Sequence, residues 1–340
     1  MKRAVNQRDL AGAAGVCPAT ISLALRNHPS IPEETRARIR ALAAELGYQP
    51  NPRVAELMGQ IRRNRSANHL TESVALYWSD ADEDTVQGYA HLVGMEEAVR
   101  KHLRSQGYDL VCCYHDHSSR SPARIERMLQ ARGIRGVLLA PLIRLPHRHL
   151  KWKWDALSVV ILGSGLWRPE FNRVRFNHFE EMGILLHHLH HRGLRRIGLV
   201  TDRVVDNRSQ RAVSGGFLAR ISPALRGINP LFESDGKDRP SFLAWLKHFA
   251  PECLIIHSSQ VPGWLRGVRN IPPLAFASTN LLAEGHPCTG IYQDYALLGK
   301  MGAEQLMGQL LLNRMGIPDA PANMHIMGML QSTDTRSERA

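Results

Sequence analysis

The 340-residue sequence contains no run approaching the roughly 20 consecutive apolar residues of a membrane-spanning helix, so such a helix is excluded. Its five cysteines include no C-x-x-C pair, which excludes a redox or metal motif of that spacing. Cys112 and Cys113 are adjacent in an apolar run, as expected for buried thiols in a reducing compartment. No apolar segment follows the basic start Met1–Arg3, so no signal peptide is expected. We expect a cytoplasmic protein.

Motifs of common enzyme classes are also missing, since the chain has no G-x-S-x-G, no P-loop and no H-E-x-x-H. The run LLHHLHHRG places His187 and His191 four residues apart on one helix face. No acid or cysteine completes a metal site there at ligand spacing, so we interpret the run as a solvated helix face. We expect no metal, no cofactor and no enzymatic activity. An enzyme built on the α/β part of the chain stays a weaker hypothesis. Turnover of a ligand that stabilises the protein would support it.

Acidic residues are scarce relative to basic ones. The chain has 43 Lys and Arg against 31 Asp and Glu, a net charge of +12. Residues 1–65 hold eleven basic and five acidic side chains, so half of this excess (+6) lies in a fifth of the chain. A local excess of this kind favours a polyanionic partner once a binding motif is found within it.

That motif is a pattern of three short helices over residues 6–14, 18–26 and 32–46. A small residue, Ala11, lets the first two helices approach, and Gly15 permits the sharp turn between them. This spacing is typical of a helix-turn-helix, whose second helix enters the major groove of DNA.

From residue 73 onward the pattern changes to alternating strands and helices. Apolar strands are expected at 73–78, 109–114, 136–142, 158–163, 173–176, 196–200, 253–258, 274–278 and 289–292. Helices are expected between several of them, at 94–106, 123–132, 180–192 and 297–313. Nearly continuous apolar strands separated by helices indicate parallel sheets covered on both faces, and their number indicates two α/β subdomains.

The stretch DLAGAAGVCPATISLALRNHPSIPEETRARIRALAAELGYQPN resembles the DNA-binding domain of the lactose-repressor (LacI/GalR) family of bacterial transcription regulators. The segments LVGMEEAVRKHLRSQGYDL, HLHHRGLRRIGLV and GIYQDYALLGKMGAEQLMGQL resemble later parts of that family, in the same order. The resemblance implies a helix-turn-helix domain (1–48), a hinge helix and linker (49–71) and an effector-binding and dimerisation core (72–335). The core is expected to have the periplasmic-binding-protein-like fold of two doubly wound parallel sheets. Its N-subdomain is expected at about 72–166 and 295–321, and its C-subdomain at about 167–294 and 322–335.

The resemblance also implies the DNA-contacting residues. Thr20 and Ser22 match hydroxyls that contact phosphates, and Arg26 is placed to add a phosphate contact. The three base-facing positions hold Pro18, Ala19 and Leu23, which make no bidentate hydrogen bonds but can pack on thymine methyl groups. The remaining contacts expected in this domain are those of Asn6, Gln7, Cys17, Asn27, Thr35 and Tyr48.

The family's hinge helix inserts a leucine into the minor groove, and the match puts Asn51, Val54 and Leu57 on its positions, beside Arg53. A shift of one residue would put Met58 in the place of Leu57. The alternative role of Leu57 and Met58 is to pack the hinge helix of one subunit against that of the other.

Effector-binding residues are expected at the carboxyl ends of the strands, where open α/β sheets bind ligands. Arg211 resembles the effector-binding arginine of the family, with a spacing that differs by one or two residues. The candidates are Trp78, Ser79, Leu142, Asn177, Asp202, Arg211, Ser258, Ser278, Gln293 and Asp294. The stretches FASTN and HSSQ lack acids that the family often has there, which weakens the case for a standard sugar effector.

Together these patterns predict a dimeric, sequence-specific regulator, a repressor, that binds a palindromic operator on double-stranded DNA and is switched by a small-molecule, sugar-like effector. The alternative is a ligand-binding module of the periplasmic-binding-protein type without a DNA function. Deleting residues 1–60 separates the two hypotheses, because only the regulator would lose DNA affinity while keeping its ligand.

Overall fold

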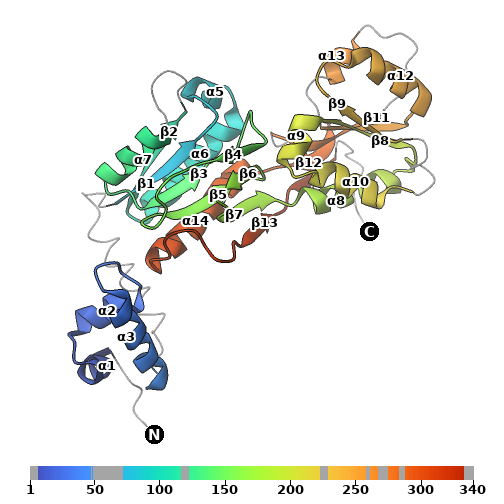
Figure 1. Ribbon diagram of the computed structural model, residues 1–340. Coiled ribbons are helices and arrows are strands. Elements are labelled where there is room, and N and C mark those ends of the chain that lie inside the picture. The colour runs from blue at the N-terminus through green and yellow to red at the C-terminus, as the bar shows by residue number, and fades with distance from the viewer. Residues whose placement is uncertain are drawn as a thin grey trace.

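The structure is a computed structural model that describes residues 7–46, 48, 72–115, 122–222, 229–257, 261–266, 275–282 and 288–332. Within these residues the chain forms a small helical domain at the amino terminus and two α/β subdomains (Figure 1).

The amino-terminal domain consists of α1 (Gln7–Ala14), α2 (Pro18–Leu25) and α3 (Glu33–Glu45), in agreement with the predicted pattern. Gly15 makes the turn between α1 and α2 with a φ of +67°, a conformation that favours glycine. The three helices enclose a small apolar core in which four side chains are fully buried: Leu10, Ile21, Ala24 and Ile39.

The first α/β subdomain, the N-subdomain, is built on a six-stranded parallel sheet with the strand order β13-β7-β5-β3-β1-β2. Its strands are β1 (Glu72–Trp78), β2 (Tyr108–Tyr114), β3 (Gly136–Leu139), β5 (Ser158–Leu162), β7 (Asn172–Phe176) and β13 (Asn323–Ile326). A two-stranded ribbon of β4 (His147–His149) and β6 (Leu166–Arg168) lies beside it.

Helices cover both faces of this sheet, as its apolar strands require. On one face α6 (Ala90–Ser105) and α14 (Tyr295–Leu311) pack together, and the short α5 (Glu83–Gln87) precedes them. The two long helices approach closely at Gly299, where an added Cβ would lie 2.8 Å from the carbonyl oxygen of Met95. On the other face α7 (Pro122–Ala131) covers a second apolar cluster, which includes Trp152 and Trp154.

The C-subdomain has a second six-stranded sheet, with the order β14-β12-β11-β10-β8-β9, parallel except for the antiparallel edge strand β14. Helices again lie on both faces, α8 and α10 on one and α12 and α13 on the other (Figure 1). The strands are β8 (Ile197–Asp202), β9 (Leu231–Ser234), β10 (Cys253–His257), β11 (Ala275–Leu281), β12 (Thr289–Tyr292) and β14 (Met329–Gln331). The helices are α8 (His178–His191), α9 (Arg203–Arg208), α10 (Ala212–Arg220), α12 (Arg239–Phe249) and α13 (Val261–Leu265).

The expected subdomain boundaries were wrong by several residues. β7 pairs with β5, and β13 pairs with β7, so residues 172–176 and 323–326 belong to the first sheet and not to the C-subdomain. The crossings between the subdomains therefore lie near residues 177, 294 and 327. The chain also forms five strands that were not predicted (β4, β6, β9, β13 and β14), which have only three or four residues each.

Candidate functional site

The second helix of the amino-terminal domain has one buried and one accessible face. Ile21 and Ala24 are fully buried against α1 and α3. The opposite side consists of Pro18 and Ala19, which are exposed, with Ser22, Leu23 and Arg26 following one and two turns later. The three predicted base-facing residues and two of the predicted phosphate contacts, Ser22 and Arg26, therefore share one accessible side of α2.

Two polar pairs lie on this helix. The Nη2 group of Arg26 donates to the hydroxyl of Ser22 over 2.6 Å, and its Nε group donates to the Ser22 carbonyl over 3.0 Å. Cys17 occupies the N-cap position, where it makes no side-chain hydrogen bond to the helix backbone. Its sulfur lies 3.2 Å from the hydroxyl of Thr20, and hydrogen bonding to Thr20 lowers the pKa of the Cys17 thiol. The groups predicted to contact phosphates thus pair with one another in the structure.

Other residues of the predicted DNA face have structural contacts. Asn27 follows α2 in the left-handed conformation, with a φ of +56°, and its carbonyl accepts from Nη1 of Arg36 over 2.9 Å and from Nδ2 of Asn313. Tyr48 packs against the apolar core of the helical domain, and Thr35 is half-buried on α3. Of the other predicted contacts, Asn6, the side chain of Gln7, and Asn51, Arg53, Val54, Leu57 and Met58 lie outside what the structure describes, so they stay predictions.

The contact of Asn313 with Asn27 joins the helical domain to the N-subdomain at the end of α14. Leu23 and Arg26 line a cavity of about 240 Å³ at this junction, whose other walls come from His28, Glu72, Tyr108, Arg135, Leu310, Leu311 and Asn313. Part of the face predicted to read DNA therefore faces the core in this arrangement.

Several predicted effector residues are helix caps. Oδ1 of Asp202 accepts from the backbone N–H groups of Val204 and Val205 at the start of α9. Oδ1 of Asp294 caps α14 and Oδ1 of Asn177 caps α8 in the same way. Aspartate and asparagine are favoured at N-caps because their side chains satisfy N–H groups that lack helical partners. These three side chains have a local structural role that their position at strand ends does not reveal.

Two more candidates belong to the interior of the N-subdomain. Trp78 is fully buried, and its indole N–H donates to Oε1 of the buried Glu96 over 2.6 Å, so both the ring and its polar atom are taken up inside the N-subdomain. Leu142 is 7% exposed and packs in the cluster beneath α7. Ser79 is buried as well, but its hydroxyl has no hydrogen-bond partner in the described part of the chain.

The remaining candidates lie in the C-subdomain. Arg211 forms a salt bridge with Glu233 and lies 4.0 Å from the carboxylate of Asp206, so its charge is already compensated. Gln293 is buried and donates to Oε2 of Glu181 over 3.0 Å. The hydroxyl of Ser278 accepts from the backbone N–H of Asn280, while Ser258 falls outside the described residues.

Two residues that were not predicted instead donate hydrogen bonds from the C-subdomain to the N-subdomain. Arg208 donates through Nη1 to the carbonyls of Leu142 and Ile143, and Gln210 donates to the carbonyl of Ser164 over 3.2 Å. These acceptors follow β3 and β5, and the donors follow β8, so the carboxyl ends of both sheets meet at these contacts. The sequence signal was present, since Arg208 lies three residues before Arg211 in the same polar turn.

On the N-subdomain side, Asp80 fixes the loop that holds these acceptors. Its carboxylate accepts from the backbone N–H groups of Ile143 (3.1 Å), Arg144 (2.8 Å) and Leu145 (2.9 Å), and the side chain is 5% exposed. Three consecutive N–H groups around one anion form a nest-like arrangement. The loop is thereby held where its carbonyls meet Arg208.

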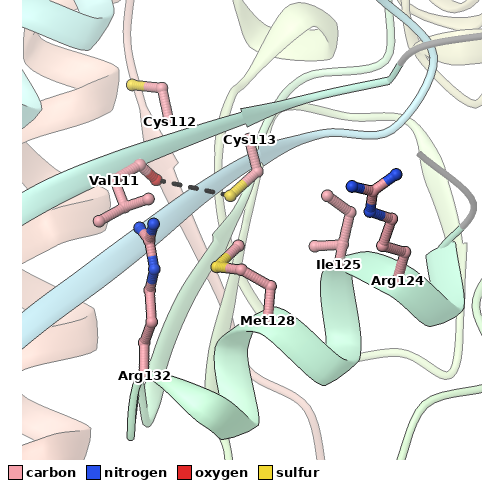
Figure 2. Close-up of a pocket in the computed structure, with 7 residues that line it drawn as sticks. All are labelled: Val111, Cys112, Cys113, Arg124, Ile125, Met128 and Arg132. Atoms are coloured by element: carbon pink, nitrogen blue, oxygen red, sulfur yellow. Dashed lines mark hydrogen bonds between the residues drawn. The ribbon is translucent and has the colours of Figure 1, made fainter. Parts of the chain in front are cut away.

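A separate cavity of about 330 Å³ lies between β2 and α7, away from the strand ends (Figure 2). Figure 2 shows Arg124 on α7 and Arg132 directly after it beside this cavity, with Cys113 and Met128 between them. Burial raises the pKa of the Cys112 thiol to about 12, so this thiol is protonated at neutral pH.

The described residues contain no helix that is long and apolar enough to cross a bilayer. The rings of His187 and His191 lie 4.3 Å apart on α8, and no group of three or more potential metal ligands comes together in the described parts of the chain.

Comparison with known proteins agrees with this arrangement. Residues 7–51 match the family described as bacterial regulatory proteins, lacI family. The transcriptional regulator PtxS of Pseudomonas aeruginosa is 25% identical to this chain, over 90% of the chain and 89% of PtxS. The transcriptional repressor PurR of Edwardsiella ictaluri is 27% identical, over 66% of the chain and 61% of PurR. A solved Lac repressor dimer, bound to operator and the anti-inducer ONPF, has the same fold, with a TM-score of 0.54 and 18% identity over 97% of this chain and 98% of that chain.

A helix-turn-helix domain on a core of two doubly wound sheets defines a DNA-binding transcription regulator with an effector-binding core. Within that class, the chain resembles the LacI family, whose model matches residues 7–51.

Proposed function

We propose that this regulator is a dimeric, sequence-specific repressor that binds an imperfectly palindromic operator and is switched by a small molecule. The observation that carries the proposal is the accessible side of α2, where Pro18, Ala19, Ser22, Leu23 and Arg26 lie together above a well-packed helical core. A helix in this position of a helix-turn-helix enters the major groove.

The chemistry of this face favours contacts with thymine methyl groups over bidentate hydrogen bonds to purines. Pro18, Ala19 and Leu23 offer only apolar surface to the base edges. Ser22 and Arg26 supply phosphate contacts, for which the Arg26 guanidinium exchanges the Ser22 hydroxyl for a phosphate oxygen. Minor-groove insertion by Leu57 or Met58 remains part of the proposal.

A dimer is favoured because a two-fold operator requires a two-fold protein. The Lac repressor structure with the same fold is a dimer bound to its operator, which supports extending this arrangement to the present chain. The small molecule is placed where the carboxyl ends of the two sheets meet, at the contacts made by Arg208 and Gln210.

Selection of DNA from a randomised duplex library by the full chain tests the DNA part of the proposal. We expect selected sites to be palindromic and rich in A·T pairs opposite α2, and fluorescence anisotropy at about 150 mM salt to show a preference over competitor DNA. A half-site of the same length serves as the control. Equal affinity for the palindrome, the half-site and unrelated DNA would contradict the proposal, and invariant guanines opposite α2 would refute the apolar readout.

A further inference from the structure

Three chain segments connect the two subdomains, and they lie against one another. The first runs from β7 into α8, the second from β12 into α14 and the third from β13 into β14. The backbone N–H of Asn177 in the first segment donates to the carbonyl of Ile326 in the third over 3.0 Å. β12 pairs with β14, which brings the second segment beside the third. We call these segments the three crossings.

A single carboxylate contacts all three crossings. Glu181 lies in the first turn of α8 and is 2% exposed. Its Oε1 atom accepts from the backbone N–H of Gly328, in the third crossing, over 2.8 Å. Its Oε2 atom accepts from the Nε2 group of Gln293, in the second crossing, over 3.0 Å, and lies 3.2 Å from Nδ1 of His178, in the first. The carboxylate therefore connects segments that are far apart in the sequence.

The amide of Gln293 extends this set of contacts. Its side chain is 2% exposed, and Nε2 donates both to Oε2 of Glu181 and to Nδ1 of His178, over 3.0 Å in each case. An amide NH₂ group has two hydrogens, so it can make both bonds at once. Gln293 therefore joins the second crossing to two side chains at the start of α8.

The third crossing packs as closely against the other two as a glycine allows. A Cβ added at Gly328 would lie 2.8 Å from the carbonyl oxygen of Tyr292 and 3.1 Å from Oε1 of Glu181. A larger residue at this position would push the third crossing away from the carboxylate. The glycine lets its backbone N–H reach Glu181 directly.

The buried carboxylate depends on these donors. Removing a charged group from water is costly, and hydrogen bonds to the charge offset that cost. If the subdomains rotated about the crossings, the donors of Gly328 and Gln293 would move relative to α8, and Glu181 would stay buried with fewer partners. The contacts therefore favour one arrangement of the crossings over others.

We propose that Glu181 is a positioning residue, which fixes the three crossings at one point and thereby sets the orientation of the C-subdomain on the N-subdomain. The assignment concerns the crossings and not the strand ends where the small molecule is placed. Its effect on operator binding rests on the proposed function, in which the state of the core controls the affinity for DNA.

Hydrogen exchange of the full chain without DNA, followed by mass spectrometry, tests the assignment. In Glu181→Gln the introduced amide keeps one acceptor oxygen but turns its NH₂ group toward another donor, that of Gln293 or of Gly328. We expect amide exchange to become faster by about tenfold or more in peptides from all three crossings, and to stay unchanged in peptides from β1 and β3. Faster exchange in the third crossing alone would show a local bond without a shared positioning role, and would overturn the proposal.

Exchanging the two side chains separates the polar contact from general packing. In the double variant Glu181→Gln with Gln293→Glu, the introduced amide can donate to the introduced carboxylate while its oxygen accepts from Gly328, and His178 can carry its proton on Nδ1 to donate to that carboxylate. We expect exchange in the crossings to return to within about threefold of that in the unmodified chain. Glu180→Gln makes the same change in charge at an exposed position of α8 and serves as the matched control, with no change expected. Circular dichroism confirms that each variant is folded, and a double variant that exchanges as fast as Glu181→Gln would reject the assignment.

Fluorescence anisotropy with the selected palindromic duplex then links the crossings to DNA binding. We expect Glu181→Gln to change the operator affinity by about threefold or more, and the double variant to restore it. Faster exchange with an unchanged operator affinity contradicts the effect on DNA but keeps the positioning role. A chain that binds no palindrome contradicts the proposed function, whereas the exchange experiment still decides the role of Glu181.

Discussion

Replacing Asp80 with alanine is expected to lower the free energy of unfolding by about 3 kcal/mol, a large effect for one polar side chain. The Asp80 carboxylate is 5% exposed and accepts from three backbone N–H groups of the loop that follows β3. Without it, these donors lose the carboxylate that holds them next to the end of β1, and the loop loses this anchor.

The size of this loss in the free energy of unfolding depends on whether the three N–H groups find another partner. Leaving a buried N–H group unsatisfied costs about 1–3 kcal/mol, so a simple sum would lie between about 3 and 9 kcal/mol. Arg144 and Leu145 are exposed, which allows water to reach part of the loop and replace the carboxylate. The loss is therefore expected at the lower end. Asp80→Asn should lose less, because all three N–H groups reach one oxygen, Oδ2, which an amide oxygen can replace, while the NH₂ group would meet only the Ile143 N–H.

Urea unfolding followed by circular dichroism measures this loss for Asp80→Ala and Asp80→Asn. Asp155→Asn removes the same charge from an exposed position of the same subdomain and is expected to change stability by less than about 0.5 kcal/mol. A loss below about 1 kcal/mol for both Asp80 variants would show that the loop holds its position without the carboxylate. Asp80 would then not be the residue that positions the carbonyl groups to which Arg208 donates.

Three further predictions concern packing, pH and DNA. Gly299→Ala should destabilise the chain by about 1–3 kcal/mol because its Cβ meets the Met95 carbonyl, whereas Gly308→Ala, with open space around it in the same helix, should be neutral or stabilising in urea unfolding. Burial, with the nearby charges of His178 and Arg208, lowers the pKa of His257 from 6.5 to about 3. As the pH falls below 6.5, the unfolded chain therefore takes up a proton at His257 that the folded chain does not, and the free energy of unfolding decreases. The loss should reach about 1–2 kcal/mol at pH 5 and be smaller in His257→Gln; equal pH profiles would contradict this assignment. Leu23→Ala should weaken operator binding most at sites with a T·A pair opposite α2, as measured by anisotropy on site variants, and a uniform loss at all sites would argue against methyl contacts.

The DNA-reading face could be predicted from the sequence because its information is local. A helix of eight residues divides its side chains by position alone, so burial of Ile21 and Ala24 places Pro18, Ala19 and Ser22 on the other side. The main strands of both sheets were predicted for the same reason, since each is a continuous apolar run. The short edge strands β13 and β14 lack such a run, and their pairing with β7 and β12 depends on contacts between residues about 40 to 150 positions apart.

The effector residues could not be predicted equally well, because a polar residue at a strand end has two possible uses that the sequence does not separate. Asp202 ends β8 and Asp294 closely follows β12, as ligand-binding residues do, but each also precedes a helix and caps it. Arg208 ends α9 and Arg211 follows three residues later, and only the tertiary structure gives Arg211 an acidic partner while Arg208 contacts backbone carbonyls among the described residues. The useful criterion is therefore whether the polar atoms of a strand-end residue are already satisfied. By that criterion Asp202, Asp294 and Arg211 belong to the scaffold, whereas the buried hydroxyl of Ser79 has no partner in the described part of the chain and stays a candidate for ligand binding.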